Sequence, residues 1–103
     1  MTSKQERFLL TCGWCGKRIK KTSEVFTVGA QARPGFHLEQ HEGEIIELAL
    51  ILADRKVSAM IPMNDSEAKR RGNDFLFVVC SQKCGNELKR ALQAEKNLID
   101  NVN

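Results

Sequence analysis

Two cysteine pairs decide the fold of this chain: Cys12-Gly13-Trp14-Cys15 near its start and Cys80-Ser81-Gln82-Lys83-Cys84 near its end. Together they contain all four cysteines of the protein. Two closely spaced pairs on separate segments can supply the four soft ligands that a tetrahedral zinc ion takes. The sequence therefore predicts a structural Zn²⁺ site whose ligands are Cys12, Cys15, Cys80 and Cys84.

The residues around the cysteines predict the local backbone. Gly16 can adopt the positive φ that lets backbone N–H groups point at thiolate sulfur. Ser81 has the position of an N-cap for a helix that begins at Gln82. Cys84 would then lie in the first turn, where free N–H groups and the helix dipole favour a thiolate. A knuckle followed by a ligand pair at a helix N-terminus is the layout of a treble-clef finger.

These motifs resemble known zinc-binding families. The stretches Cys12-Gly-Trp-Cys15-Gly-Lys-Arg-Ile and Val79-Cys80-Ser-Gln-Lys-Cys84 are similar to the archaeal ribosomal large-subunit protein of the twenty-four-e family. They are equally similar to TRASH-type treble clefs, which are linked to heavy-metal sensing and trafficking. The resemblance covers roughly residues 8–30 and 74–95, and in those families far fewer residues separate the two pairs. It implies metal binding and a local treble-clef fold, and it does not carry a ribosomal role.

Length and composition predict one small α+β domain over residues 1–103, with antiparallel β-hairpins and a C-terminal helix. A chain of 103 residues with 42% hydrophobic content has single-domain size. The two halves of the finger would span about 8–30 and 74–99, with an insertion at about 36–73. The polar N-terminus does not resemble a signal peptide, and no apolar run approaches the roughly 20 residues that span a bilayer. We therefore expect a cytoplasmic protein without membrane partners, in surroundings where paired cysteines hold metal.

Several further elements are expected along the chain. Residues 1–7 are interpreted as a polar terminus without regular structure. The hydrophobic pattern of residues 44–54 fits a strand or a helix, although the short polar link that follows favours a β-hairpin with residues 57–62. The remaining expectations are a strand within residues 22–30, a helical turn at 65–71, a strand at 74–79 covered on both faces, and a last helix whose apolar stripe runs from Cys84 to Ile99.

The case for catalysis is weak, and we expect no enzyme and no small-molecule substrate. Sites with four cysteine ligands are usually closed, whereas catalytic zinc keeps an open position. A redox role for Cys12-Gly-Trp-Cys15 is a lesser alternative. Redox motifs of this spacing normally begin a helix, and Gly16 with the basic run after it does not predict one. His37 and His41 could share a face at i, i+4, but the neighbouring glycines favour exposed polar side chains instead.

Charge suggests a partner. Basic residues dominate 1–35 and 69–103, whereas acidic residues outnumber basic ones in 36–68. A nucleic-acid-binding role, with RNA or DNA as partner, would use Trp14 for stacking and the bases Lys17, Arg18, Lys20 and Lys21 for phosphates. The alternatives are a solvated loop that offsets the thiolate charge and a Trp14 that packs over the finger. A protein partner docking on the insertion, or metal sensing through the same thiolates, are the other functions that the sequence leaves open.

Overall fold

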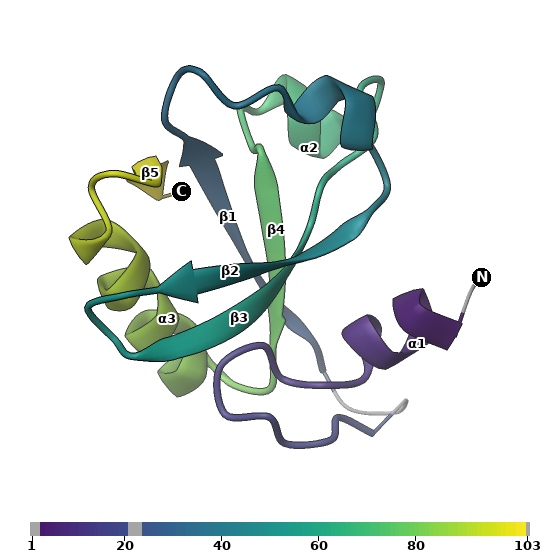
Figure 1. Cartoon of the computed structure of the whole chain (residues 1–103). Helices are drawn as coiled ribbons and strands as arrows, with labels where there is room; N and C mark the ends of the chain where they lie inside the picture. Colours follow the sequence, from purple (N-terminus) through teal and green to yellow (C-terminus); the bar gives the residue numbers. More distant parts are fainter. Residues whose placement is uncertain (1–2, 21–23, 103) are drawn as a thin grey trace.

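The protein is represented by a computed structural model that describes residues 3–20 and 24–102. In these residues the strands form one curled antiparallel sheet in the order β2-β3-β4-β1-β5 (Figure 1). Their bounds are β1 Phe26–Ala32, β2 Ile45–Leu50, β3 Arg55–Met60, β4 Phe75–Val79 and β5 Ile99–Val102. The β2–β3 hairpin is paired along its whole length, but β3 meets β4 only at Met60 and Leu76. The hairpin therefore diverges from β4 beyond this pair, and it crosses in front of β1 and β4 in Figure 1.

Helices cover one side of the sheet and its ends. They are α1 Ser3–Leu9, the 3-10 helix η1 Leu38–His41, α2 Glu67–Arg70 and α3 Gln82–Ala94. The long helix α3 packs against β1, β4 and β5. Within the described residues, no helix combines the length and the apolar character needed to cross a membrane.

The hydrophobic core lies between the hairpin, the central strands and α3. In β4, Phe75 and Phe77 are fully buried on one face, and Val78 is buried on the other. This confirms the prediction of a strand covered on both faces. Leu88 and Leu92 fill the core from α3, where they recur at i and i+4.

The ambiguous segment 44–54 is a strand followed by a turn. Leu48 and Leu50 of β2 are buried, whereas Glu47 and Ala49, which alternate with them, are exposed, which is the period-two pattern of a half-buried strand. The hairpin predicted for residues 44–62 is therefore confirmed. Its inner face belongs to the same core cluster as β4 and α3.

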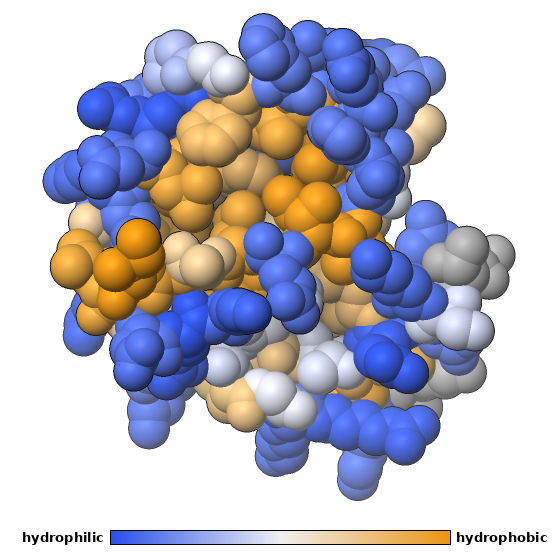
Figure 2. All heavy atoms as spheres, in the orientation of Figure 1, coloured by the Kyte–Doolittle hydropathy of each residue, from blue (hydrophilic) through white to orange (hydrophobic). Residues whose placement is uncertain are grey.

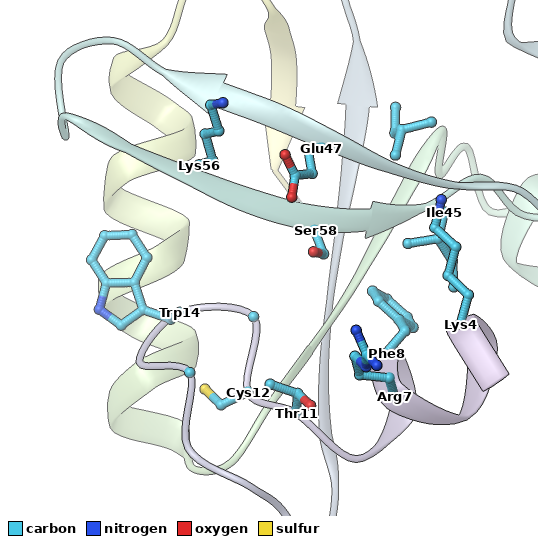
Figure 3. A pocket seen from close by; sticks show the side chains of 13 residues that line it. Lys4, Arg7, Phe8, Thr11, Cys12, Trp14, Ile45, Glu47, Lys56 and Ser58 are labelled. Atoms are coloured by element: carbon cyan, nitrogen blue, oxygen red, sulfur yellow. The ribbon is translucent and has the colours of Figure 1, made fainter.

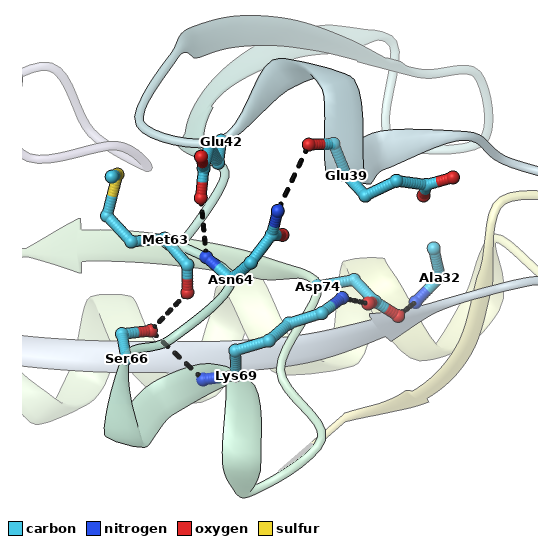
Figure 4. Close-up of polar contacts among 8 residues, drawn as sticks. All are labelled: Ala32, Glu39, Glu42, Met63, Asn64, Ser66, Lys69 and Asp74. Carbon is cyan, nitrogen blue, oxygen red and sulfur yellow. Dashed lines mark hydrogen bonds and ion pairs between the residues drawn. The ribbon is translucent and has the colours of Figure 1, made fainter.

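Polar contacts hold the short helix α2 in place (Figure 4). The Ser66 hydroxyl accepts a hydrogen bond from the Lys69 N–H at 3.2 Å, and Gly72 ends the turn with φ +88°. The predicted helical turn at 65–71 is thus confirmed. Asp74 accepts from Lys69 Nζ at 2.5 Å and from the Ala32 N–H at 2.9 Å, so its carboxylate ties α2 to the end of β1.

Three expectations about element boundaries were wrong. The terminus expected to lack structure forms α1, because Phe8 is buried in the core and α1 packs against β2. The strand expected within 22–30 begins at Phe26 and continues to Ala32, and residues 21–23 lie outside the described part. The last helix ends at Ala94, and Ile99 pairs with Ala32 as part of β5. Ile99 is still buried, which is why it matched the apolar stripe of the helix.

The two histidines are exposed, as predicted, and neither approaches the cysteines. His37 precedes η1 and has a side chain that is 81% exposed. The His41 Nδ1 atom lies 2.6 Å from Glu44 Oε2. The pair therefore belongs to the surface of the segment that joins β1 to β2.

Candidate metal centre

The first cysteine pair lies in a tight backbone knuckle. The Cys12 N–H donates to the Lys17 carbonyl at 2.8 Å, and the Gly16 N–H donates to the Cys12 carbonyl at 3.0 Å. Gly16 has φ +77°, as the sequence predicted, which closes the turn without strain from a side chain. An isolated bridge between Thr11 and Arg18 marks the open end of the knuckle.

A backbone contact fastens the knuckle to the sheet. The Gly13 N–H donates to the carbonyl of Val78, near the end of β4, at 2.6 Å. A Cβ atom at position 13 would lie 3.1 Å from that carbonyl oxygen, so glycine permits the close approach. The contact places Cys12 and Cys15 beside the strand that carries Cys80.

The second pair is positioned by the start of α3. Ser81 has extended φ and ψ of −159° and 165°, and its hydroxyl accepts from the Cys84 N–H at 3.2 Å. Ser81 is therefore the N-cap, and the prediction of a helix from Gln82 is confirmed. Cys80 precedes the cap and Cys84 follows in the first turn, so the helix N-terminus presents both sulfur atoms on one side.

The fold brings all four sulfur atoms into one cluster. The Sγ atoms of Cys12, Cys15, Cys80 and Cys84 lie within 4.8 Å of one another. The Cys15–Cys80 and Cys80–Cys84 Sγ distances are both 3.7 Å, and none of the four cysteines is in a disulfide. A tetrahedral metal with sulfur ligands at about 2.3 Å would separate the sulfur atoms by about 3.8 Å. The cluster therefore has the size needed to hold a metal ion.

Cys12 is the most buried of the four cysteines, and its thiol has a lowered pKa. Burial raises the pKa of its thiol, but backbone hydrogen bonds from Cys15, Trp14 and Cys80 outweigh this effect and lower the pKa to about 7. The Cys15 N–H lies 3.5 Å from Cys12 Sγ. Donors aimed at sulfur stabilise the thiolate, so the knuckle backbone prepares this residue to bind a cation.

Cys84 shows the opposite shift in its pKa, although it lies in the first turn of α3 as predicted. Burial raises the pKa of Cys84, and the neighbouring thiols raise it to about 12 although the Ser81 hydroxyl lowers it. The backbone hydrogen bond from Lys17 lowers the pKa of Cys15, but burial and the neighbouring thiols raise it overall. Burial and the repulsion between thiolates about 3.7 Å apart therefore outweigh the contact from the Ser81 hydroxyl. A cation among the sulfur atoms would remove this repulsion.

Trp14 contacts α3 and the start of β3. Its indole N–H donates to Glu87 Oε2 at 2.6 Å, and the Arg55 guanidinium lies 3.7 Å from the ring centroid. Arg55 also donates to the Trp14 carbonyl at 2.9 Å. Trp14 is therefore held by contacts within the protein, and one face of its ring is covered by the guanidinium of Arg55.

Sequence reasoning missed Arg55 and Glu87 as neighbours of the site. Glu87 follows Cys84 by three residues in α3, so helical spacing alone could have placed it beside the knuckle. Arg55 begins β3, on the far side of a long segment, and no local pattern pointed to it.

The predicted phosphate-binding bases are only partly described. Lys17, Arg18 and Lys20 are exposed on the knuckle and the segment after it, while Ile19 between them is buried. Lys21 lies outside the described residues. The three basic side chains therefore point to solvent, while the buried Ile19 holds the backbone against the core.

Comparisons of the chain with protein-family models, with curated proteins and with solved structures found no match. The fold and the cluster therefore define the class of protein on their own. It is a small α+β domain in which four cysteines from two distant segments form a site that could bind a metal ion.

Proposed function

We propose that this chain is a non-catalytic binding module built around one structural zinc ion in a treble-clef finger. The observation that carries the proposal is the grouping of the four sulfur atoms within 4.8 Å of one another, with two of the distances at 3.7 Å, close to the value for tetrahedral coordination. Tetrahedral sites with four sulfur ligands are typical of zinc, with iron as the main competitor. The order of elements also supports a treble clef: a knuckle, an antiparallel pair β1–β4, and a helix whose N-terminus carries the second cysteine pair.

Metal analysis tests this proposal. We expect purified protein to contain about one zinc per chain, and Cys12→Ser, Cys15→Ser, Cys80→Ser and Cys84→Ser each to lose most of it, because a missing thiolate opens the site. Trp14→Phe is the matched control. It alters a residue between two ligands and removes the indole hydrogen bond to Glu87, yet it should retain zinc.

Two results would contradict the zinc site. Folded protein free of metal, with the cysteines joined in two disulfides, would remove the basis of the whole proposal. Iron in place of zinc, with the same loss in the serine variants, would keep the cluster as a metal site and overturn the identity of the ion.

We further propose that the module associates with nucleic acid. The observation that favours this role is the gathering of basic side chains from three segments around the knuckle. Arg7 of α1 lines one hollow together with Arg18 of the knuckle, and a second hollow together with Lys4 and Lys56. Between described residues, no ion pair within 4.0 Å involves any of these four bases. Lysine and arginine side chains that gather around one face without ion-pair partners are typical of a phosphate-binding surface.

Charge removal on the knuckle tests this association. The double variant Lys17→Gln with Lys20→Gln should keep its zinc and bind single-stranded RNA more weakly. The slope of log K against log salt should flatten by about one to two, roughly 0.7–1 for each phosphate contact removed. Fluorescence anisotropy over a salt series measures both effects. Arg90→Gln with Lys96→Gln, in the second half of α3 and in the turn that follows it, is the control and should leave binding unchanged.

Absence of RNA and DNA binding by the parent protein at low salt would overturn nucleic-acid association and favour a protein partner. The surface to test would then be the turn between β2 and β3, because the inner face of the hairpin is buried. Ile51 and Leu52 in this turn are 80% and 71% exposed. Apolar spheres gather at the left edge of Figure 2, where the turn lies.

A further inference from the structure

A pocket of about 460 Å³ lies between α1, the knuckle and the outer face of the β2–β3 hairpin (Figure 3). Its volume falls within the roughly 300–1,000 Å³ of typical ligand sites. It shares a wall with the candidate metal centre, because Cys12 and Trp14 border it. The side chains that give the pocket its chemistry are Lys4, Arg7, Phe8, Glu47, Lys56 and Ser58.

The charges in this pocket follow an order. In Figure 3, Lys4 and Arg7 lie at the α1 end, Lys56 lies toward the opposite end, and Glu47 lies between them beside Ser58. The three basic side chains outnumber the single carboxylate, and none of the four forms an ion pair within 4.0 Å between described residues. Their charges are therefore available to a ligand.

The pocket also has an apolar wall. Phe8 is only 6% exposed and reaches the pocket from α1, while Ile45 of β2 is partly buried and borders it from the hairpin. A flat ring lying against this wall would contact both the helix and the hairpin. Nucleobases stack on aromatic surfaces without regard to sequence, because every nucleobase has a π-face.

We propose that this pocket binds one nucleotide of a single-stranded nucleic acid, with phosphates near Lys4 and Arg7 at one end and near Lys56 at the other. The base lies on the wall formed by Phe8 and Ile45, with its polar edge at Glu47. This inference rests on the nucleic-acid association proposed above and assigns its site. An acidic peptide could also pair with the three basic side chains, but its carboxylates would be repelled by the carboxylate of Glu47.

Glu47 makes the pocket selective for the base. An ionised carboxylate only accepts hydrogen bonds, so it favours bases with an exocyclic amino group. Cytosine offers its N4 amino group at the position where uracil has the O4 acceptor, and carboxylates are suited to that amino group. Because the two pyrimidines are nearly equal in size, cytosine and uracil differ at this site in hydrogen bonding alone.

The test compares oligocytidylate with oligouridylate of equal length, bound to zinc-loaded protein and followed by fluorescence anisotropy. We expect the parent to bind oligocytidylate about tenfold more tightly. Glu47→Gln should abolish this preference, because the amide can donate as well as accept. Arg7→Gln should weaken binding of both oligomers and keep the preference. Arg90→Gln, outside the pocket, should change neither.

The outcomes separate the pocket from the broader proposal. If the parent binds both oligomers equally and Glu47→Gln has no effect, the pocket is overturned while association through the knuckle stands. The second readout is the response of the Phe8 and Ile45 amide signals to cytidine and uridine monophosphates. A response to the cytidine nucleotide without oligomer binding would support the pocket and overturn nucleic-acid association. No response and no binding would overturn both.

Discussion

Removing the metal with a strong chelator is expected to unfold most of the domain. Structural zinc contributes about 10–16 kcal/mol of apparent binding free energy at neutral pH, whereas a domain of this size has a net stability of about 5–15 kcal/mol. The ion would also link the knuckle at residues 12–15 to the start of α3, which are segments from opposite ends of the chain. We expect the melting temperature to fall by at least about 20 °C.

Two optical signals measure this effect in different parts of the molecule. Far-ultraviolet circular dichroism follows the sheet and α3, while the fluorescence of Trp14, the single tryptophan, follows the knuckle. Adding zinc back under reducing conditions should restore both signals. Cys15→Ser should behave like the chelated protein, whereas Trp14→Phe should melt close to the parent in the dichroism signal.

A chelated protein that is shown to be metal-free and melts like the parent would contradict a structural role for the ion. Loss of the Trp14 signal alone, with unchanged dichroism, would mean that the metal holds only the knuckle. The remaining sheet would then be stable through the core formed by β1, β4 and α3.

Leu50→Asp is expected to destabilise the whole domain by at least about 3 kcal/mol, through the lost apolar burial and the burial of a carboxylate. Leu50 is only 1% exposed and faces the core from β2. The hairpin is also joined to the C-cap of α3, because the Leu52 N–H donates to the buried Glu95 Oε1 at 2.7 Å. A damaged hairpin would therefore loosen the end of α3, and thermal melting should show a fall of more than about 10 °C.

The neighbouring residue provides a matched control. Ile51 is 80% exposed, so Ile51→Asp introduces the same charge one position away without burying it. Its melting temperature should stay within a few degrees of the parent. Equal melting of Leu50→Asp and the parent would show that the hairpin is peripheral, and its apolar face would then be open to a partner.

The residue pattern by itself determined the parts of the protein that depend on near neighbours. The serine cap before Gln82, the positive φ at Gly16 and the continuous apolar strand expected at 74–79 are all confirmed, because each depends on a few adjacent residues. The cysteine spacing also predicted the four-sulfur cluster, although nothing in the sequence showed how residues 16–79 would leave the two pairs side by side.

Tertiary contacts decided the rest. Residues 44–54 matched two periodicities, and pairing of β2 with β3 over the buried core selected the strand. The N-terminal residues form α1 because Phe8 is buried in the core. The end of the predicted helix is instead part of β5, because Ile99 pairs with Ala32. Arg55 is adjacent to Trp14, and Lys56 to the pocket, only because the hairpin crosses the central strands. Contacts between distant segments depend on burial and pairing in three dimensions, so the periodicity of a short stretch of sequence does not predict them.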